Sequence, residues 1–319
     1  MEIRIDANIY ARLADVLRRQ LGTSGAFSPS QMASAIDDIA ILPEARDPIV
    51  GMATKEMTSA VSPNAAYVAS RALIGQSHIT VVDLPACSVV YDNAFELCLR
   101  IESVSLPACE TIGIGAFMSC AGLRSIDMPA CREVGVSAFY GCTTLSHVSL
   151  PVCESVRDFT FGRCQALVDV VAPACTYVGY NVFVSCTGLS TVSLPACTAT
   201  GSEAFQYCTS LASVSIPSCS VIASRAFYRC YRLSEISLPA CETISREAFY
   251  GCSVLTKVDL TGVSAVPSLS SGAFDYTPVG GWSSYTGAYG SVFVPSSLYE
   301  AFLEVPEWLL LSSRIVSAR

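Results

Sequence analysis

The sequence predicts a solenoid of stacked parallel β-strands, built from repeats of about 22 residues. The first observation is the cysteine spacing, because all sixteen cysteines follow an 11-residue step from Cys87 to Cys252. The second is their context. The cysteines alternate between a position after proline, such as Cys131 after Pro129, and a position three residues after an Ala-Phe pair, such as Cys142. Two contexts on an 11-residue step make the true period 22.

The third observation is a fixed set of apolar columns, with the pattern L-x-x-V-x-L-P-x-C-x-x-V-x-x-x-A-F-x-x-C-x-x. The segment 126–128 alternates inward and outward residues as a half-buried strand does, and Pro129 ends the strand because proline cannot donate to a ladder. The segment from Val134 to Phe139 is expected to form another short strand or a helical turn, with the Phe139 ring in the interior. One unit cannot bury its apolar columns alone, so neighbouring units are expected to stack in register.

These columns resemble those of the BspA-like, or Treponema-type, leucine-rich repeat family, through L-x-x-V-x-L-P followed by V-x-x-x-A-F-x-x-C. The resemblance covers roughly residues 57 to 319, and several columns coincide over the regular units. The extra cysteine after proline and a period near 22, where the family more often has about 23, depart from the family pattern. The resemblance implies a leucine-rich-repeat solenoid and a bacterial surface or host-interaction adhesin.

Degenerate repeats at both ends predict caps. Pro63 and Leu73 hold repeat columns without the cysteines, which predicts an N-cap at residues 57–78 before the regular repeats at 79–254. Further along, Val258 belongs to a ninth strand, the segment 292–295 repeats the strand-proline signature, and Ser296 to Leu311 is expected to form a terminal helix. Residues 255–319 are therefore predicted to form a C-terminal helical cap that covers the last open strand edge.

The first forty residues do not follow the repeat. Leu13, Val16 and Leu17 recur at helical spacing, and Ser28-Pro29 opens a second helix, so residues 1–40 are predicted to form an α-helical hairpin. Residues 41–56 are then the linker. The hairpin segment resembles a short N-terminal segment common on tail-associated proteins of phages that infect gut bacteria. That resemblance implies attachment to a virion structural protein through residues 1–40.

Composition argues against several partners. The formal net charge of -8 and the lack of a basic stripe argue against DNA and RNA. The first residues contain no apolar stretch before a small-residue cleavage site, which predicts no secretion signal. No run approaches about 18 consecutive apolar residues, so direct membrane insertion is not expected. No motif indicates a cofactor.

The cysteine columns admit three interpretations. Free cysteine packs as a small hydrophobe, which favours buried reduced thiols, whereas stacked thiols could also bind a soft metal or form disulfides. A metal site is not predicted, because no C-x-x-C pair or nearby histidine offers zinc spacing. An enzyme is not predicted either. His78 and His147 show no partner in the sequence, and the paired carboxylates Asp37-Asp38 fit a solvated helix end.

The candidate ligand-binding residues lie in the columns that the repeat leaves free, beside the Ala-Phe pair and the following cysteine. In the sixth to eighth units, stacking is expected to gather them into one aromatic and arginine patch, a composition favoured at interface hot spots. Its members are Tyr207, Tyr228, Arg229, Tyr231, Arg232 and Tyr250. The patch fits a sugar ring, a peptide or ordinary solvated surface. Tyr140 is expected to lie too far along the stack to join it, and the small, polar outward strand column is not expected to be a hot spot.

Three non-enzymatic functions follow, in order of preference. The first is a phage tail-associated adhesin on the virion tail surface, whose solenoid binds a glycan or protein on a bacterial surface. The alternative is a BspA-like adhesin on the bacterial cell surface, which binds a protein or glycan of a host cell. The third is a cytosolic protein-interaction scaffold.

Overall fold

The computed structural model describes residues 48–49, 58–281 and 286–318. The chain divides into two compact units, Met1–Asp47 and Pro48–Arg319, and the described residues all belong to the second. The helical hairpin predicted for residues 1–40 lies outside the described residues. Within the predicted linker, Pro48–Ile49 forms strand β1, which pairs in parallel with β3 (Tyr67–Val68).

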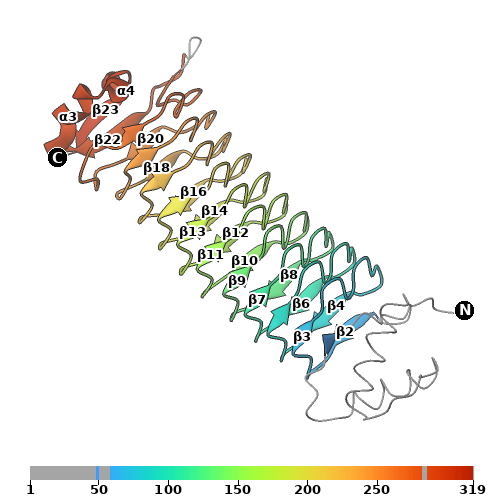
Figure 1. The fold of residues 1–319 in the computed structure, drawn as a ribbon. Coiled ribbons are helices and arrows are strands. Elements are labelled where there is room, and N and C mark those ends of the chain that lie inside the picture. Colours follow the sequence, from blue (N-terminus) through green and yellow to red (C-terminus); the bar gives the residue numbers. More distant parts are fainter. Residues whose placement is uncertain (1–47, 50–57, 282–285, 319) are drawn as a thin grey trace, which may run out of the picture. The chain divides into compact units, whose positions relative to one another are not determined.

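The second unit is a solenoid in which the coils contribute strands to two parallel rows (Figure 1). The predicted 22-residue spacing is confirmed, since Ser103 pairs in register with Val81 on one side and Ser125 on the other. The first row contains β2 (Ser59–Val61), β4 (Val81–Asp83), β6 (Ser103–Ser105), β8 (Ser125–Asp127), β10 (His147–Ser149), β12 (Asp169–Val171), β14 (Thr191–Ser193), β16 (Ser213–Ser215), β18 (Glu235–Ser237), β20 (Lys257–Asp259) and β22 (Ser291–Pro295). The second row contains β1, β3, β5 (Val89–Val90), β7 (Thr111–Ile112), β9 (Glu133–Val134), β11 (Ser155–Val156), β13 (Tyr177–Val178), β15 (Ala199–Thr200), β17 (Val221–Ile222), β19 (Thr243–Ile244) and β21 (Ser268–Leu269).

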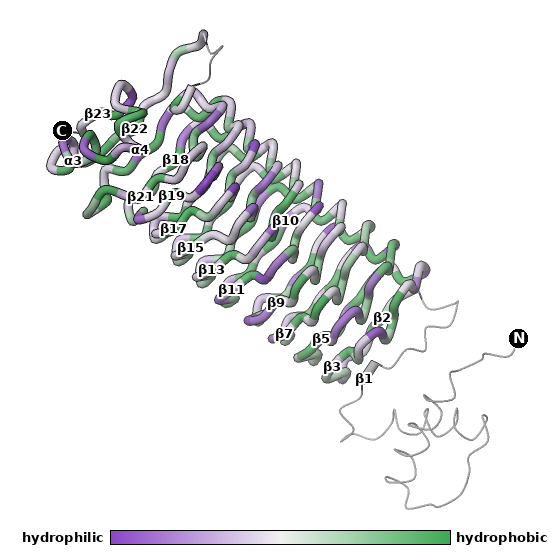
Figure 2. The backbone as a smooth tube through the Cα atoms, turned by 45° about the horizontal axis from the view of Figure 1, so that its top comes forward, coloured by the Kyte–Doolittle hydropathy of each residue, from purple (hydrophilic) through white to green (hydrophobic). Residues whose placement is uncertain are grey.

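Each coil follows from its sequence columns. In the coil that begins with β8, Asp127 is exposed and Met128 is buried, which is the predicted alternation. The second half of this coil is a two-residue strand, β9, followed by tight turns closed by backbone hydrogen bonds. These turns bring Ala138 and Phe139 into the interior, where both are fully buried. Figure 2 shows the result, with apolar residues at the same places in successive coils.

The two rows differ in continuity. Among the described residues, the second row is one eleven-stranded sheet, whereas the first row is divided among three sheets, with breaks after β8 and after β16. The middle residue on one side of each break, Ile126 or Val214, is only partly buried, while the equivalent Val170 is 1% exposed. The first row is therefore locally open at two places.

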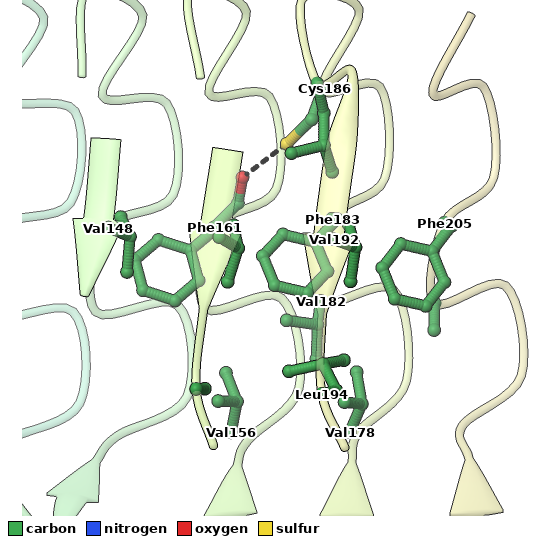
Figure 3. Packing of buried hydrophobic residues seen from close by; sticks show 14 of the residues in the cluster. Val148, Val156, Phe161, Val178, Val182, Phe183, Cys186, Val192, Leu194 and Phe205 are labelled. Atoms are coloured by element: carbon green, nitrogen blue, oxygen red, sulfur yellow. Dashed lines mark hydrogen bonds between the residues drawn. The ribbon is translucent and has the colours of Figure 1, made fainter. Parts of the chain in front are cut away.

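The interior contains a continuous stack of phenylalanine rings, drawn in part in Figure 3. Neighbouring rings lie nearly parallel, with centroids 5.0 Å apart between Phe95 and Phe117 and 5.6 Å apart between Phe161 and Phe183. Beside each ring from Phe95 to Phe249 a buried cysteine donates a hydrogen bond to the preceding coil, as Cys186 Sγ does to the Phe161 carbonyl at 3.0 Å. The stack consists of Phe95, Phe117, Phe139, Phe161, Phe183, Phe205, Phe227, Phe249 and Phe274.

The C-terminal cap is helical, but the single helix predicted for residues 296–311 is wrong. The segment forms the 3₁₀ turn η1 (Ser296–Leu298), helix α3 (Tyr299–Glu304), helix α4 (Pro306–Leu309) and the 3₁₀ turn η2 (Ser312–Arg314). Pro306 separates the helices, because proline lacks the N–H that a continuous helix needs. The last strand edge was predicted to be covered by this helix. Instead, β23 (Ile315–Ala318) pairs in parallel with β22 and extends the sheet.

The cap closes the interior with an aromatic ring. Trp308 is fully buried, its ring centroid lies 6.3 Å from that of Phe274, and its Nε1 donates to the Pro267 carbonyl at 2.7 Å. Trp308 therefore covers the last ring of the phenylalanine stack. In the described part of the chain, no helix is long and apolar enough to cross a bilayer.

Candidate functional site

The turns after the second row of strands form one surface of the solenoid, here called the turn face. Each turn places two residues at positive φ, one before the Ala-Phe pair and one two residues after it. Asn93 and Gly141, with φ of 55° and 75°, show the residue types that favour this conformation. Elsewhere the same columns hold larger side chains: Phe159, Arg163, Glu203, Tyr207, Arg225, Arg229, Glu247 and Tyr276.

Stacking holds these turns in their conformation. The backbone N–H of Tyr207 donates to the Tyr228 carbonyl at 2.9 Å, and that of Arg229 donates to the Tyr250 carbonyl at 2.8 Å. A left-handed conformation costs a residue other than glycine roughly 1–3 kcal/mol, so it persists where the surrounding structure determines it. The bulky residues at these positions are therefore not required by the backbone, which accepts glycine or asparagine in other coils.

Four of the predicted ligand-binding residues contact one another on this face. The rings of Tyr228 and Tyr250 are stacked with centroids 4.9 Å apart, and the Tyr207 ring meets Tyr228 edge-on at 5.8 Å. The Arg229 guanidinium lies 5.3 Å from the Tyr228 ring centroid and 5.8 Å from that of Tyr207. Tyr276, which was not predicted from the sequence, extends this row of rings; its ring is tilted by 52° to that of Tyr250, with the centroids 4.9 Å apart.

The two remaining predicted residues are placed less centrally. Tyr231 is 41% exposed, and its phenol, after that of Tyr228, helps to raise the pKa of Arg229. Arg232 is exposed, and within the described residues it makes no ion pair or ring contact with the others. Five of the six predicted residues thus form one neighbourhood.

A column of alternating charge runs beside the tyrosines and was not identified from the sequence. Arg225 Nε donates to Glu247 at 2.6 Å, and its Nη1 lies 3.8 Å from Glu203. The hydrogen bond and charge of Glu247 raise the pKa of Arg225, and the same contact lowers the pKa of Glu247. The signal was available, because these residues all stand immediately before an Ala-Phe pair, 22 residues apart.

The contacts continue toward the N-terminus as far as Tyr140, contrary to the expectation that this residue stands apart. The Tyr140 ring meets Phe159 edge-on at 6.4 Å, and Phe159 meets Tyr180 at 5.2 Å. Tyr180 in turn donates its hydroxyl to Glu203 at 3.5 Å. The Arg163 guanidinium lies 5.8 Å from the Tyr140 ring centroid.

Together these side chains form a surface that we call the turn-face ladder. Its members are Tyr140, Phe159, Arg163, Tyr180, Glu203, Tyr207, Arg225, Tyr228, Arg229, Glu247, Tyr250 and Tyr276.

The strand face, which is the outward side of the first row of strands, lacks the long aromatic and charged side chains of the turn-face ladder over most of its described length. Its outward column is small and mostly polar, as predicted, and shallow depressions of about 420 and 280 Å³ lie on it beside the breaks after β8 and β16. His147 does have a partner, contrary to the sequence analysis, because Asp169 occupies the same register position on β12 and contacts its Nδ1. Both side chains are more than a third exposed. The two residues are 22 positions apart in the sequence, and the parallel pairing of β10 with β12 places them side by side.

The two cysteine columns are part of the interior. All sixteen thiols are buried and free of disulfides. Burial raises the pKa of Cys98 to about 11 and that of Cys186 to about 12, so these thiols stay protonated at neutral pH. In the described part of the chain, no group of three or more histidine, cysteine or acidic residues is arranged to hold a metal ion.

The fold and its surfaces define a leucine-rich-repeat solenoid with one uniform and one variable face. The model of the BspA type leucine rich repeat region (six copies) matches residues 88–211 and 154–280, and the chain belongs to this family. No curated protein matches the sequence.

Several solved structures are similar to the chain. A leucine rich cell surface protein from Faecalibacterium prausnitzii A2-165 is 19% identical, with 67% of this chain and 81% of that one covered and a TM-score of 0.37. The leucine rich repeat protein of T. pallidum is 22% identical, with 70% and 87% covered and a TM-score of 0.40. A leucine-rich repeat protein from Bacteroides ovatus ATCC 8483 is 17% identical, with 85% and 88% covered and a TM-score of 0.35.

Proposed function

We propose that this protein is a non-enzymatic adhesin of the bacterial cell surface, and that it binds a partner on another cell through the turn-face ladder. The observation that carries the proposal is the concentration of tyrosine, arginine and glutamate at left-handed turn positions. The same backbone positions hold glycine, asparagine or serine in other coils, for example Gly115, Asn181 and Ser185. Strained backbone that carries large polar side chains is a mark of functional surfaces.

The composition of the ladder supports a binding role. Tyrosine and arginine are enriched among the residues that contribute most to binding energy. The central side chains are half-buried and held by one another through ring and cation–π contacts, so little side-chain entropy remains to be lost on binding. The ladder is therefore preorganised for contact with a partner.

The choice among the three binding functions follows from the family. The BspA-type repeat match covers most of the solenoid and favours a surface adhesin. The phage tail-associated function depends on residues 1–40, which lie outside the described residues, and the cytosolic scaffold has no specific observation in its favour. A catalytic role is not proposed, because neither described depression of the strand face is lined by histidine or cysteine.

The proposal can be tested by cell attachment. The double variant Tyr228→Ala/Arg229→Ala removes the centre of the ladder, and the matched control His147→Ala/Asp169→Ala removes an exposed pair from the strand face. With a panel of labelled bacterial and epithelial cells, we expect attachment to fall by about tenfold or more for the first variant and to stay unchanged for the control. Flow cytometry measures attachment, and melting curves verify folding.

Two results would reject the proposal. One is undiminished attachment of the folded ladder variant, and the other is the absence of wild-type attachment to every cell type in the panel. Since Tyr228 contributes packing, the charge reversal Arg229→Glu serves as a second ladder variant if the double variant unfolds. Glutamate occupies left-handed positions of the other column of these turns, at Glu203 and Glu247, so this backbone conformation accepts a glutamate side chain.

A further inference from the structure

We propose that the ligand of the turn-face ladder is a linear acidic polysaccharide, which lies along the solenoid axis and places carboxylate groups on Arg163 and Arg229. This inference rests on the proposed function and names the class of ligand. It follows from three properties of the ladder: which ring faces are occupied, which arginines lack a carboxylate partner, and how those arginines are spaced.

The central aromatic faces are already occupied. The Tyr228 ring is stacked on Tyr250 with an angle of 6° between the planes, and the Arg229 guanidinium lies near both the Tyr228 and the Tyr207 rings. A neutral sugar that binds by stacking needs a free ring face. The groups that remain for a ligand are phenolic hydroxyls and guanidinium N–H groups, which recognise hydroxyls and anions through hydrogen bonds.

The arginines of the ladder differ in their partners. Arg225 is held between Glu247 at 2.6 Å and Glu203 at 3.8 Å, so its charge is balanced within the protein. Arg163 and Arg229 contact tyrosine rings, and in the described part of the chain neither lies within salt-bridge distance of a carboxylate. A guanidinium offers five N–H donors in a planar fork that matches a carboxylate. Within the ladder, an anionic group of a ligand is therefore expected to gain the most binding energy at Arg163 and Arg229.

The two unpaired arginines share one column. Each stands two residues after the phenylalanine of its turn, with φ of 60° for Arg163 and 58° for Arg229. Their numbers differ by 66, which is three repeats of 22, so at roughly 4.8 Å per coil they lie about 14 Å apart along the axis. Ser185 and Tyr207 stand between them in the same column. A polymer with regularly repeated carboxylates can contact both arginines and offer hydroxyls to the residues between.

The surface fits a polysaccharide better than an acidic peptide. Extended peptides bind by adding a strand to free backbone groups or by placing side chains in pockets. On the turn face the backbone N–H groups of Tyr207 and Arg229 already donate to the next coil, so they are not free to pair with an added strand. Phenols and a guanidinium, by contrast, match the hydroxyls and carboxylates of a uronic acid chain.

The test uses the full chain and three defined probes. Polygalacturonate carries a carboxylate on each sugar, its fully methyl-esterified form is the neutral control, and poly-L-glutamate is the acidic polypeptide. We expect the protein to bind polygalacturonate with an affinity that falls as salt rises, and not to bind the methyl ester. Arg163→Gln and Arg229→Gln should each weaken binding by roughly tenfold. Lys257→Gln, which removes the same charge from the strand face, should leave affinity unchanged.

Oligogalacturonates of increasing length test the orientation. Because a second contact on the same chain acts at high effective concentration, affinity should rise once an oligomer spans both arginines. The Arg163→Gln variant should remove that rise while short oligomers bind the variant and the wild type equally. Absence of a length-dependent difference between the variant and the wild type would overturn the axial arrangement.

The outcomes separate this inference from the proposed function. If the ladder variants lose cell attachment but polygalacturonate does not bind, the acidic polysaccharide is wrong and the adhesin proposal stands. Preference for poly-L-glutamate, dependent on Arg229, replaces the polysaccharide by an acidic polypeptide. Equal binding of the methyl ester overturns the role of the carboxylate. If the ladder variants keep both cell attachment and polygalacturonate binding, both proposals are rejected.

Discussion

The strand face and the turn face belong to the same coils and follow opposite rules. On the strand face the backbone is extended, residues of neighbouring strands within the regular sheets pair in register 22 positions apart, and the outward column stays small and mostly polar. On the turn face the backbone is left-handed at two positions per coil, and the side chains range from Gly141 to Arg229 and Tyr276. Both faces therefore have a backbone conformation that repeats from coil to coil. The type of the exposed side chain varies widely only on the turn face.

The largest expected effect is alkaline unfolding, which disrupts both faces together. It follows from ionisation of the buried cysteine thiols in the interior that the two faces share. Burial raises the thiol pKa to about 11 for Cys98 and about 12 for Cys142 and Cys186, against about 8.5 in an unfolded chain. A group whose folded pKa is raised stabilises the fold below the unfolded value and loses that contribution as pH rises through the folded value. We expect the protein to be stable to about pH 8.5 and to unfold cooperatively as pH approaches 11.

The magnitude supports this expectation, because a shift of about 2.5 pKa units corresponds to about 3 kcal/mol for one thiol. Several such thiols together match the total stability of a typical domain, about 5–15 kcal/mol. Circular dichroism in reducing buffer measures the transition, and thiolate absorbance should rise with it. Retention of the strand signal through pH 11 would contradict the prediction.

A smaller but still large effect is expected from a gap in the phenylalanine stack. Phe183 lies between Phe161 at 5.6 Å and Phe205 at 5.2 Å and is fully buried. Phe183→Ala should lower the free energy of unfolding by about 3–5 kcal/mol, since a large buried cavity replaces the ring. Denaturant unfolding measures the loss.

The same experiment shows whether the two faces depend on one core. Phe183→Leu is the matched control and should cost less, because Leu73 occupies this column in the first coil. Because coils interact with their nearest neighbours, both surfaces near the substitution should loosen together. A loss below about 1 kcal/mol for Phe183→Ala would show that the rings are not tightly packed.

The smallest expected effect comes from replacing one serine by glycine on each face and comparing the free energies of unfolding. Ser185 stands in a left-handed turn with φ of 58°, whereas Ser193 ends strand β14. Glycine adopts positive φ without a steric cost but weakens a strand by about 0.5–1 kcal/mol. Ser185→Gly should therefore leave the free energy of unfolding unchanged or raise it by up to about 1 kcal/mol, and Ser193→Gly should lower it. Equal losses in urea titrations would mean that the faces do not differ in backbone demand.

Most of the fold could be predicted because a stacked repeat turns sequence columns into spatial columns. The 22-residue period predicted the register, the buried position of Phe139, the ninth strand and the degenerate first coil. The same logic placed Tyr207, Tyr228, Arg229 and Tyr250 side by side. It was not applied to the residue before each Ala-Phe pair, so the charged column through Arg225 was missed.

Other features depend on interactions that a repeat pattern does not contain. The pairing of His147 with Asp169 requires two neighbouring coils to differ from the consensus at the same register position. Tyr140 joins the ladder only through Phe159 and Tyr180, so its place depends on ring orientations. The broken terminal helix reflects Pro306 within an otherwise apolar helical pattern, and β23 forms because β22 leaves an open edge.

The sequence by itself determined the solenoid, its period, the residues of its core and the existence of a helical C-terminal cap. Coils stacked at a constant spacing can bury their apolar columns in one register only, which leaves little choice to the chain. The tertiary structure alone decided which long side chains meet on the turn face, which arginines find a carboxylate and how the last strand edge is extended. Those outcomes depend on the sign of φ in each turn and on the rotamers of neighbouring side chains, which the period does not specify.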